Sequence, residues 1–89
     1  MVIKRLIWDE WNTTHIYEHS VIPEEVEEVC KGKHFLTKGR QKTYRVIGQT
    51  QDGRYLTIIL ASKSKSEFYT ITARDSDSKE IRQYKKKIK

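Results

Sequence analysis

The hydrophobic pattern of the chain changes its period at residue 34, and this change limits the folds open to it. Before that point, Val26, Val29 and Cys30 repeat at the i, i+3, i+4 spacing of a helix. From residue 34 to residue 73, apolar and polar residues alternate as they do in strands, and Asp52-Gly53 is a strong hairpin signal. A helical pattern returns after residue 77. The sequence therefore predicts an α+β domain with helices outside a mostly antiparallel sheet, in the order β-α-α-β-β-β-β-α.

Capping residues predict where the helices begin and end. Asp9 begins the first helix, because an acid there accepts the free N–H groups of the first turn. Pro23 begins the second helix, which ends at Gly32. Asp77 precedes the last helix, and Glu80 follows it at capping-box spacing. The predicted helices span residues 9–19, 23–31 and 79–84, and the predicted strands span residues 2–8, 34–37, 44–50, 54–61 and 67–73.

Alternation assigns the strand residues to two faces of the sheet. The predicted sheet core consists of Leu56, Ile58, Leu60, Tyr69, Ile71 and Ala73. If Val46 also faces the core, Arg45 lies on the same face as Thr72 and Arg74. That opposite face carries hydroxyl groups with cations at its margin. It is either plain solvent-exposed sheet or a groove for a phosphate chain.

Charge is distributed unevenly along the 89 residues. Lys and Arg total 18 and Asp and Glu total 12, which gives a net charge of +6. Residues 1–30 carry two basic and seven acidic side chains, so they sum to −5, and the rest of the chain sums to +11. The basic part favours a polyanion as partner, and the acidic part would repel one. The acidic second helix also offers a docking surface for a basic partner.

Composition excludes several classes of protein. No apolar run approaches ~18 residues and no signal-peptide pattern is present, so we expect a cytoplasmic protein without membrane contact. Cys30, the single cysteine, excludes an intramolecular disulfide and a Cys-based zinc module, and it is expected in the core. No Gly-rich phosphate loop occurs, and no cofactor is expected. One domain over residues 1–89 is predicted, with residues 85–89 a frayed basic tail.

Four residues near the first predicted helix could carry chemistry, and each has a simpler interpretation. His15 and His19 stand one helical turn apart, as zinc-binding pairs do. No Cys cluster or His-Glu-x-x-His motif accompanies them, so we expect surface or interface histidines and no metal. His19 is also a candidate for proton transfer. Trp8 and Trp11 could stack on bases, but in so small a domain we expect both to anchor the core.

Motifs along nearly the whole chain resemble those of BrnT-type toxins. They are Ile7-Trp8-Asp9-Glu10, Asn12, His15, His19, Val21-Ile22-Pro23-Glu24-Glu25-Val26, Tyr44-Arg45-Val46-Ile47-Gly48, Asp52-Gly53-Arg54-Tyr55-Leu56, Thr70-Ile71-Thr72-Ala73-Arg74-Asp75 and Lys79-Glu80-x-Arg82-x-Tyr84. The resemblance implies a RelE-like fold, a small antiparallel sheet with two N-terminal helices and a C-terminal helix. It also implies a toxin of a type II toxin–antitoxin pair, which cuts RNA and so inhibits translation. The implied partner is a small antitoxin protein, in a complex that we expect to be oligomeric.

Four basic positions and one histidine of that family have counterparts in this chain. They fall on Arg45, Arg74, Lys79, Arg82 and His19. The chain departs from the family beside the histidine, where Glu18 and Ser20 stand in place of a Lys and a Gly. Glu18 would repel a phosphate, which weighs against catalysis by His19.

The implied reaction is metal-independent cleavage of RNA, in which the 2′-hydroxyl attacks the adjacent phosphate. We expect Arg45 and Arg74 to hold that phosphate, because a guanidinium fork can bind two of its oxygens. His19 or Tyr84 is the expected proton-transfer group, although Tyr84 could equally pin the last helix to the sheet. Further contacts to RNA are expected from Lys79, Arg82, Arg54, Lys85 and Lys86. The alternative is a non-catalytic module that binds nucleic acid or docks the antitoxin.

Overall fold

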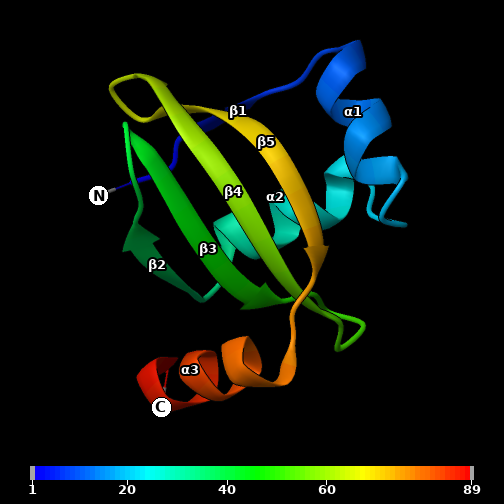
Figure 1. Ribbon diagram of the computed structural model, residues 1–89, viewed down its shortest axis with the longest axis vertical. Helices are drawn as coiled ribbons and strands as arrows, with labels where there is room; N and C mark the ends of the chain where they lie inside the picture. Colours follow the sequence, from blue (N-terminus) through cyan, green and yellow to red (C-terminus); the bar gives the residue numbers. More distant parts are fainter. Residues whose placement is uncertain (1, 89) are drawn as a thin grey trace.

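The computed structural model describes residues 2–88, and its elements follow the predicted order (Figure 1). The helices are α1 (Glu10–Tyr17), α2 (Pro23–Lys31) and α3 (Ser78–Ile88). The strands are β1 (Arg5–Ile7), β2 (His34–Lys38), β3 (Thr43–Gln49), β4 (Tyr55–Ser64) and β5 (Glu67–Asp75). The α+β class and the order β-α-α-β-β-β-β-α are therefore confirmed.

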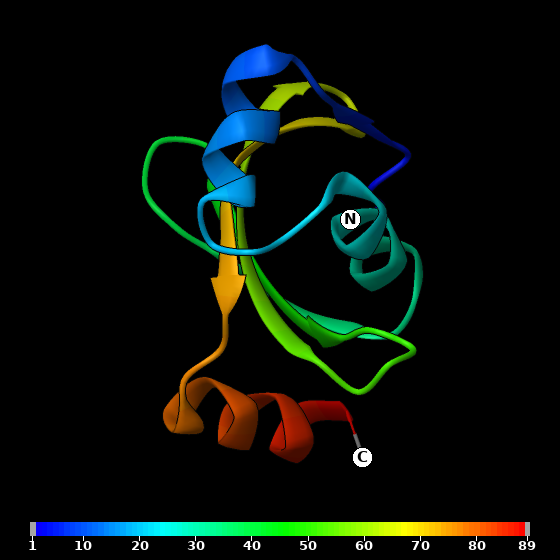
Figure 2. The same cartoon turned by 90° about the vertical axis from the view of Figure 1, so that its right-hand side faces the viewer.

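The strands form one sheet in the order β1-β5-β4-β3-β2. Strands β2 to β5 pair antiparallel with their neighbours along the chain, whereas β1 runs parallel to β5. The parallel pairing departs from the predicted antiparallel sheet. It is possible because β1 pairs with the last strand, so no tight turn forces the antiparallel direction. Since β1 and β2 are opposite edges, the chain between them crosses one face of the sheet, and α2 packs there (Figure 2).

Four strands differ in length from the prediction. β2 ends one residue later and β5 two residues later than predicted, and the other changes are in β1 and β4. β1 covers only Arg5–Ile7 of the predicted residues 2–8, because its neighbour β5 begins at Glu67, the partner of Arg5. β4 continues to Ser64 rather than ending at residue 61. The longer strand is possible because the β4–β5 hairpin closes tightly, with Ser66 at a positive φ of 71°.

The main core lies between the sheet and the two helices α1 and α2. Leu56, Ile58, Leu60 and Ala73 are fully buried there, as predicted. The remaining buried members of this core are Leu6, Ile16, Val21, Val26, Val29, Cys30, Val46 and Phe68. Helix α2 packs closely on Gly48 in β3, where a Cβ atom would lie 2.6 Å from Val29 Cγ1.

A β-bulge in β5 changes which of its residues face the core. The pairing with β4 passes from Thr72 to Thr70 and leaves Ile71 without a partner. Because one extra residue reverses the alternation, Phe68 and Thr70 are buried in the core face, and the prediction that Tyr69 and Ile71 form the core is wrong. Thr70 Oγ1 has no hydrogen-bond partner within residues 2–88.

The predicted caps of the first two helices are confirmed. Asp9 Oδ1 accepts a hydrogen bond from the Asn12 N–H at 2.9 Å, and Asn12 Oδ1 accepts one from the Asp9 N–H at 2.9 Å. Asn12 is buried and also donates to the Ile7 carbonyl, so this cap joins α1 to β1. Helix α2 begins at Pro23 and is capped by Gly32.

The last helix is longer than predicted. Asp77 and Glu80 form the expected capping box, with Asp77 Oδ1 accepting from the Glu80 N–H at 2.8 Å and Glu80 Oε1 accepting from the Asp77 N–H at 2.9 Å. The helix then continues to Ile88, so residues 85–88 are helical rather than a frayed tail. Lys89 lies outside the described residues.

The two tryptophans occupy different environments. Trp8 is half-buried against the core, and its Nε1–H donates to Glu27 Oε2 at 3.0 Å. Trp11 on α1 is 59% exposed. The expectation that tryptophan anchors the core therefore holds for Trp8 and is wrong for Trp11.

Candidate functional site

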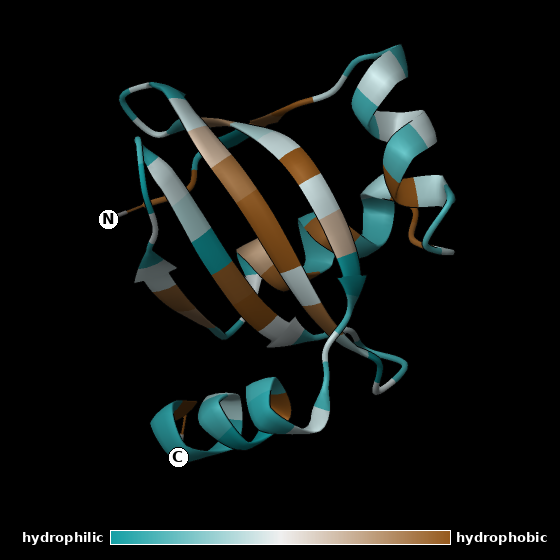
Figure 3. Cartoon of the chain, in the orientation of Figure 1, coloured by the Kyte–Doolittle hydropathy of each residue, from teal (hydrophilic) through white to brown (hydrophobic). Residues whose placement is uncertain are grey.

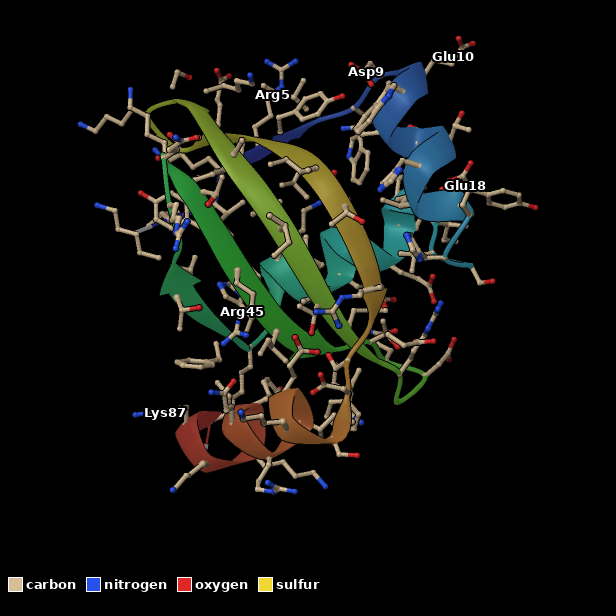
Figure 4. The ribbon with its side chains drawn as sticks, in the orientation of Figure 1. Arg5, Asp9, Glu10, Glu18, Arg45 and Lys87 are labelled. Atoms are coloured by element: carbon tan, nitrogen blue, oxygen red, sulfur yellow. The ribbon has the colours of Figure 1, made fainter. Side chains whose placement is uncertain are left out.

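The two arginines singled out from the sequence lie on one face of the sheet. Arg45 in β3 pairs with Ile59 in β4, and Ile59 in turn pairs with Thr72 in β5. Paired residues share a face and so do residues two apart on a strand, so Arg74 belongs to the same face as Arg45. The predicted parity is confirmed, and this face is opposite to the one that α2 covers. Figure 4 shows Arg45 at the end of the sheet nearest α3.

Both arginines meet at the carboxylate of Glu80 in the first turn of α3. Arg74 Nη1 donates to Glu80 Oε1 at 2.8 Å, and Arg74 Nη2 donates to Glu80 Oε2 at 2.8 Å. Arg45 Nη1 lies 3.8 Å from Glu80 Oε2. The Glu80 side chain is only 7% exposed, against 34% for Arg45 and 43% for Arg74. A buried carboxylate thus connects β3, β5 and α3.

This arrangement controls the charge of the cluster. The hydrogen bonds from Arg74 lower the pKa of Glu80 to about 2, helped by the Asp77 N–H and the Thr57 hydroxyl and opposed by burial. Glu80 in turn raises the pKa of Arg74 above its ordinary value through those hydrogen bonds, although burial opposes this effect. Glu80 is therefore ionised and Arg74 protonated near neutral pH. Together with Arg45 they carry one net positive charge.

The two arginines differ in the hydrogen-bond donors that they leave for a ligand. Both terminal nitrogens of Arg74 are bound to Glu80, and Nη1 also donates to the Asp75 carbonyl at 3.2 Å. Arg45 donates through Nη2 to Gln83 Oε1 at 3.1 Å, and its side chain makes no other hydrogen bond within residues 2–88. Arg45 Nη1 is 3.8 Å from Glu80 Oε2, beyond hydrogen-bond distance, so the other N–H groups of Arg45 can donate to an anion while Gln83 holds the guanidinium in place.

A basic surface continues from Arg45 along α3. Lys79, Arg82, Gln83 and Lys86 line a shallow depression, and Gln83 also bonds to Arg45, so the depression adjoins that guanidinium. We call Arg45 together with these four residues the Arg45 surface. Figure 3 shows α3 as hydrophilic along its outward side. The cations of this surface could neutralise successive phosphates of a nucleic-acid backbone that runs along it.

Tyr84 and Lys85, two further predicted residues, both contact Tyr55. Tyr84 is 9% exposed and packs edge-to-face on the Tyr55 ring, with the ring centroids 5.9 Å apart. Lys85 Nζ lies 5.7 Å from the centroid of the same ring. These contacts support the interpretation that Tyr84 pins α3 to the sheet.

The structure does not bring His19 to the arginine pair. His19 is exposed in the turn after α1, and its ring contacts that of His15 at 5.5 Å. Within the part of the chain that the structure describes, its side chain makes no hydrogen bond to Arg45 or Arg74. Proton transfer by His19 remains a prediction from the sequence that this geometry does not favour.

Arg54 is engaged within the protein rather than beside Arg45. Its Nε donates to Asp75 Oδ1 at 2.7 Å, and its Nη1 donates to the Ser20 carbonyl at 2.6 Å and to Glu25 Oε1 at 3.0 Å. The hydrogen bond to Asp75 raises the pKa of Arg54, with burial opposing and Glu25 adding to it. Arg54 thus ties the α1–α2 turn, where Ser20 has a positive φ of 62°, to the end of β5. We do not include it in the Arg45 surface.

Neither a cluster of metal-ligating side chains nor an exposed thiol occurs in residues 2–88. No group of three or more His, Cys, Asp or Glu side chains in this range could hold a metal ion. Cys30 is buried in the core, where burial and, to a lesser degree, Glu27 raise the pKa of its thiol to about 12. No helix in this range is long and apolar enough to cross a membrane.

The sequence did not identify Glu80 or Gln83 as site residues. The capping-box spacing pointed to Glu80 as a cap, and only the position of α3 against β5 reveals that the same carboxylate binds Arg74. Comparison with protein-family models, curated protein sequences and solved structures gave no match.

Proposed function

We propose that the chain is an RNA-cleaving toxin of a type II toxin–antitoxin pair, acting in the cytoplasm and held by a small antitoxin protein. The motifs that resemble BrnT-type toxins support this proposal. The structural observation that carries it is the Arg45 surface, a half-buried guanidinium with free donors beside the α3 cations. The proposed substrate is single-stranded RNA, whose backbone would follow this surface.

In the proposed reaction, the 2′-hydroxyl attacks the adjacent phosphate and the 5′-oxygen leaves. The positive charge of Arg45 stabilises the pentavalent phosphate, and Gln83 holds the guanidinium in a fixed orientation for this role. Arg74 acts as a positioning residue through Glu80, which lies between the two arginines. The attack leaves a 2′,3′-cyclic phosphate on one product and a 5′-hydroxyl on the other, and hydrolysis by water then opens the cyclic phosphate to a 3′-phosphate. Orientation of the hydroxyl and stabilisation of charge supply the acceleration.

A second candidate is a module that binds nucleic acid without cutting it. The bidentate Arg74–Glu80 pair favours this alternative, because it removes one of the two forks expected to grip the phosphate. Neither Tyr84 nor His19 makes a hydrogen bond to Arg45 within residues 2–88, which also favours binding alone.

The two candidates are separated by assaying the purified chain with labelled RNA, alone and with translating ribosomes. We compare wild type, Arg45→Ala and a matched control, Arg5→Ala. Arg5 is an arginine on the opposite half of the sheet, in β1, with a side chain that is 70% exposed. The proposal expects cleavage by wild type and Arg5→Ala and little by Arg45→Ala. Binding of RNA without cleavage would establish the second candidate. A chain that neither binds nor cleaves RNA would contradict both candidates.

A further inference from the structure

Helix α1 leaves two large aromatic side chains in solvent. Of its eight residues only Asn12 and Ile16 are buried. Trp11 is 59% exposed and Tyr17 is 71% exposed. The fold gains little from an exposed tryptophan, and Trp is strongly enriched among the residues that dominate protein interfaces. This half of the molecule therefore carries a surface that the Arg45 surface does not explain.

Trp11 is held in one orientation by its neighbours on the helix. Its indole stacks on the His15 ring with centroids 5.1 Å apart and planes 5° apart, and His15 in turn meets the His19 ring edge-on at 5.5 Å. A side chain that is already ordered loses less conformational entropy when a partner binds. The stack is therefore a preorganised platform.

Carboxylates stand at both ends of this platform. A shallow groove on α1 is lined by Glu10, Trp11, Thr14, His15 and Glu18. Glu10 precedes Trp11 at the start of the helix, and Glu18 follows its last residue with a side chain that is 68% exposed. Figure 4 shows both glutamates at the outer side of α1, away from Arg45 on the sheet and at the opposite end of the molecule from Lys87 on α3. We call these five residues the Trp11 groove.

Glu18 Oε1 lies 4.0 Å from His15 Nδ1, so the Trp11–His15 stack has a carboxylate near each end and is suited to a guanidinium or ammonium group. The indole ring attracts the cation electrostatically, and the carboxylates accept charge-assisted hydrogen bonds from it.

The neighbouring helix α2 adds negative charge, because a second shallow groove combines Trp8 and Pro23 with three glutamates and one lysine. The glutamates are Glu24, Glu27 and Glu28, and the lysine is Lys31, which pairs with Glu27 at 3.6 Å. The same negative charge would repel an RNA backbone.

We infer that the Trp11 groove is a docking surface for a protein partner that presents an arginine or lysine side chain, which packs on Trp11 in the groove that Glu10 and Glu18 also line. This surface is separate from the Arg45 surface, so the inference goes beyond the proposed RNA cleavage and does not depend on it. The occupant is a basic segment of another protein, chosen on charge complementarity.

The test uses the full chain and two synthetic helix-forming peptides, one with Arg at positions i and i+4 and one with Gln at the same positions. Binding is measured by anisotropy of the labelled peptides. The variants are Trp11→Ala and the matched control Tyr17→Ala, an exposed aromatic on the same helix that does not line the groove. The expected result is saturable binding of the Arg peptide alone, weakened about tenfold by Trp11→Ala and unchanged by Tyr17→Ala. Thermal unfolding confirms that both variants fold.

Three results would overturn the inference. The first is equal binding of the Arg and Gln peptides, or no binding of either. The second is an unchanged affinity for the Arg peptide in Trp11→Ala. The third is self-association of the wild-type chain in sedimentation at low salt that Trp11→Ala abolishes, because the occupant would then be a second copy of the chain.

Discussion

The guanidinium of Arg74 and the carboxylate of Glu80 make two hydrogen bonds of 2.8 Å that fasten the end of β5 to the first turn of α3. The same carboxylate caps α3 through the Asp77 N–H and lies 3.8 Å from Arg45 Nη1. One side chain therefore fixes the start of the helix and both arginines. As a consequence, Arg45 and Arg74 are not equivalent: three of the five N–H groups of Arg74 are bonded, against one of Arg45, so Arg45 keeps more donors for a ligand.

The first prediction concerns acid stability. Glu80 has a folded-state pKa of about 2 against an ordinary value of 4.5, so its stabilisation is complete above about pH 4.5 and is lost as the pH falls through about 2. The shift corresponds to about 3 kcal/mol. The free energy of unfolding of the wild type, measured with urea, should fall as the pH decreases through this window. Glu80→Gln should remove most of this pH dependence. Parallel pH profiles for the two proteins would contradict the assignment.

The second prediction is a coupling between Arg74 and Glu80. Arg74→Ala alone leaves a buried carboxylate without its main partner and should lower the free energy of unfolding by about 3 kcal/mol. Adding Glu80→Ala should recover part of this loss, with a coupling energy of about 1–3 kcal/mol in a double-mutant cycle. Additive effects of the two substitutions would show that the ion pair contributes nothing to stability.

The third prediction compares two buried threonines. Thr70 Oγ1 has no hydrogen-bond partner in the described structure, whereas Thr57 Oγ1 and Ser76 Oγ are 2.8 Å apart and hydrogen-bonded. Thr70→Val removes an unsatisfied hydroxyl at nearly constant volume and should raise the free energy of unfolding by about 1 kcal/mol. Thr57→Val, the matched control, should lower it by about 1 kcal/mol. Chemical denaturation measures both, and a loss of stability in Thr70→Val would show that the hydroxyl has a partner.

The fourth prediction concerns the salt dependence of RNA binding. Lys86 lines the depression beside Arg45, whereas Lys31 lies on α2 and pairs with Glu27 at 3.6 Å. If RNA follows the Arg45 surface, Lys86→Ala should weaken binding and reduce the slope of log affinity against log salt by about 0.7. Lys31→Ala should leave the slope unchanged. Equal slopes for both variants and wild type would place the RNA elsewhere.

Local sequence signals predicted the element order and much of the core. Caps at Asp9 and Asp77 and the hairpin at Asp52-Gly53 depend on a few neighbouring residues, and all three are as predicted. The face shared by Arg45 and Arg74 also followed, because neither arginine lies on the stretch of strand whose alternation the bulge reverses.

What could not be predicted depends on contacts between distant segments. The bulge at Ile71 depends on how β4 and β5 align, so alternation alone assigned Tyr69 and Ile71 to the wrong face. The second role of Glu80 depends on where α3 lies against β5. The exposure of Trp11 depends on which side of α1 meets the sheet, and a helix with few apolar residues gives no clear answer.

The rate of RNA cleavage per folded molecule of Arg45→Ala decides whether this guanidinium takes part in the proposed reaction. Thermal unfolding first shows that this variant folds, as expected for a side chain that is 34% exposed and not bonded as tightly as Arg74. We expect this rate to fall about 10²-fold relative to wild type, because Arg45 stabilises the charge on the phosphate. Cleavage by folded Arg45→Ala at the wild-type rate would contradict the proposed role of Arg45.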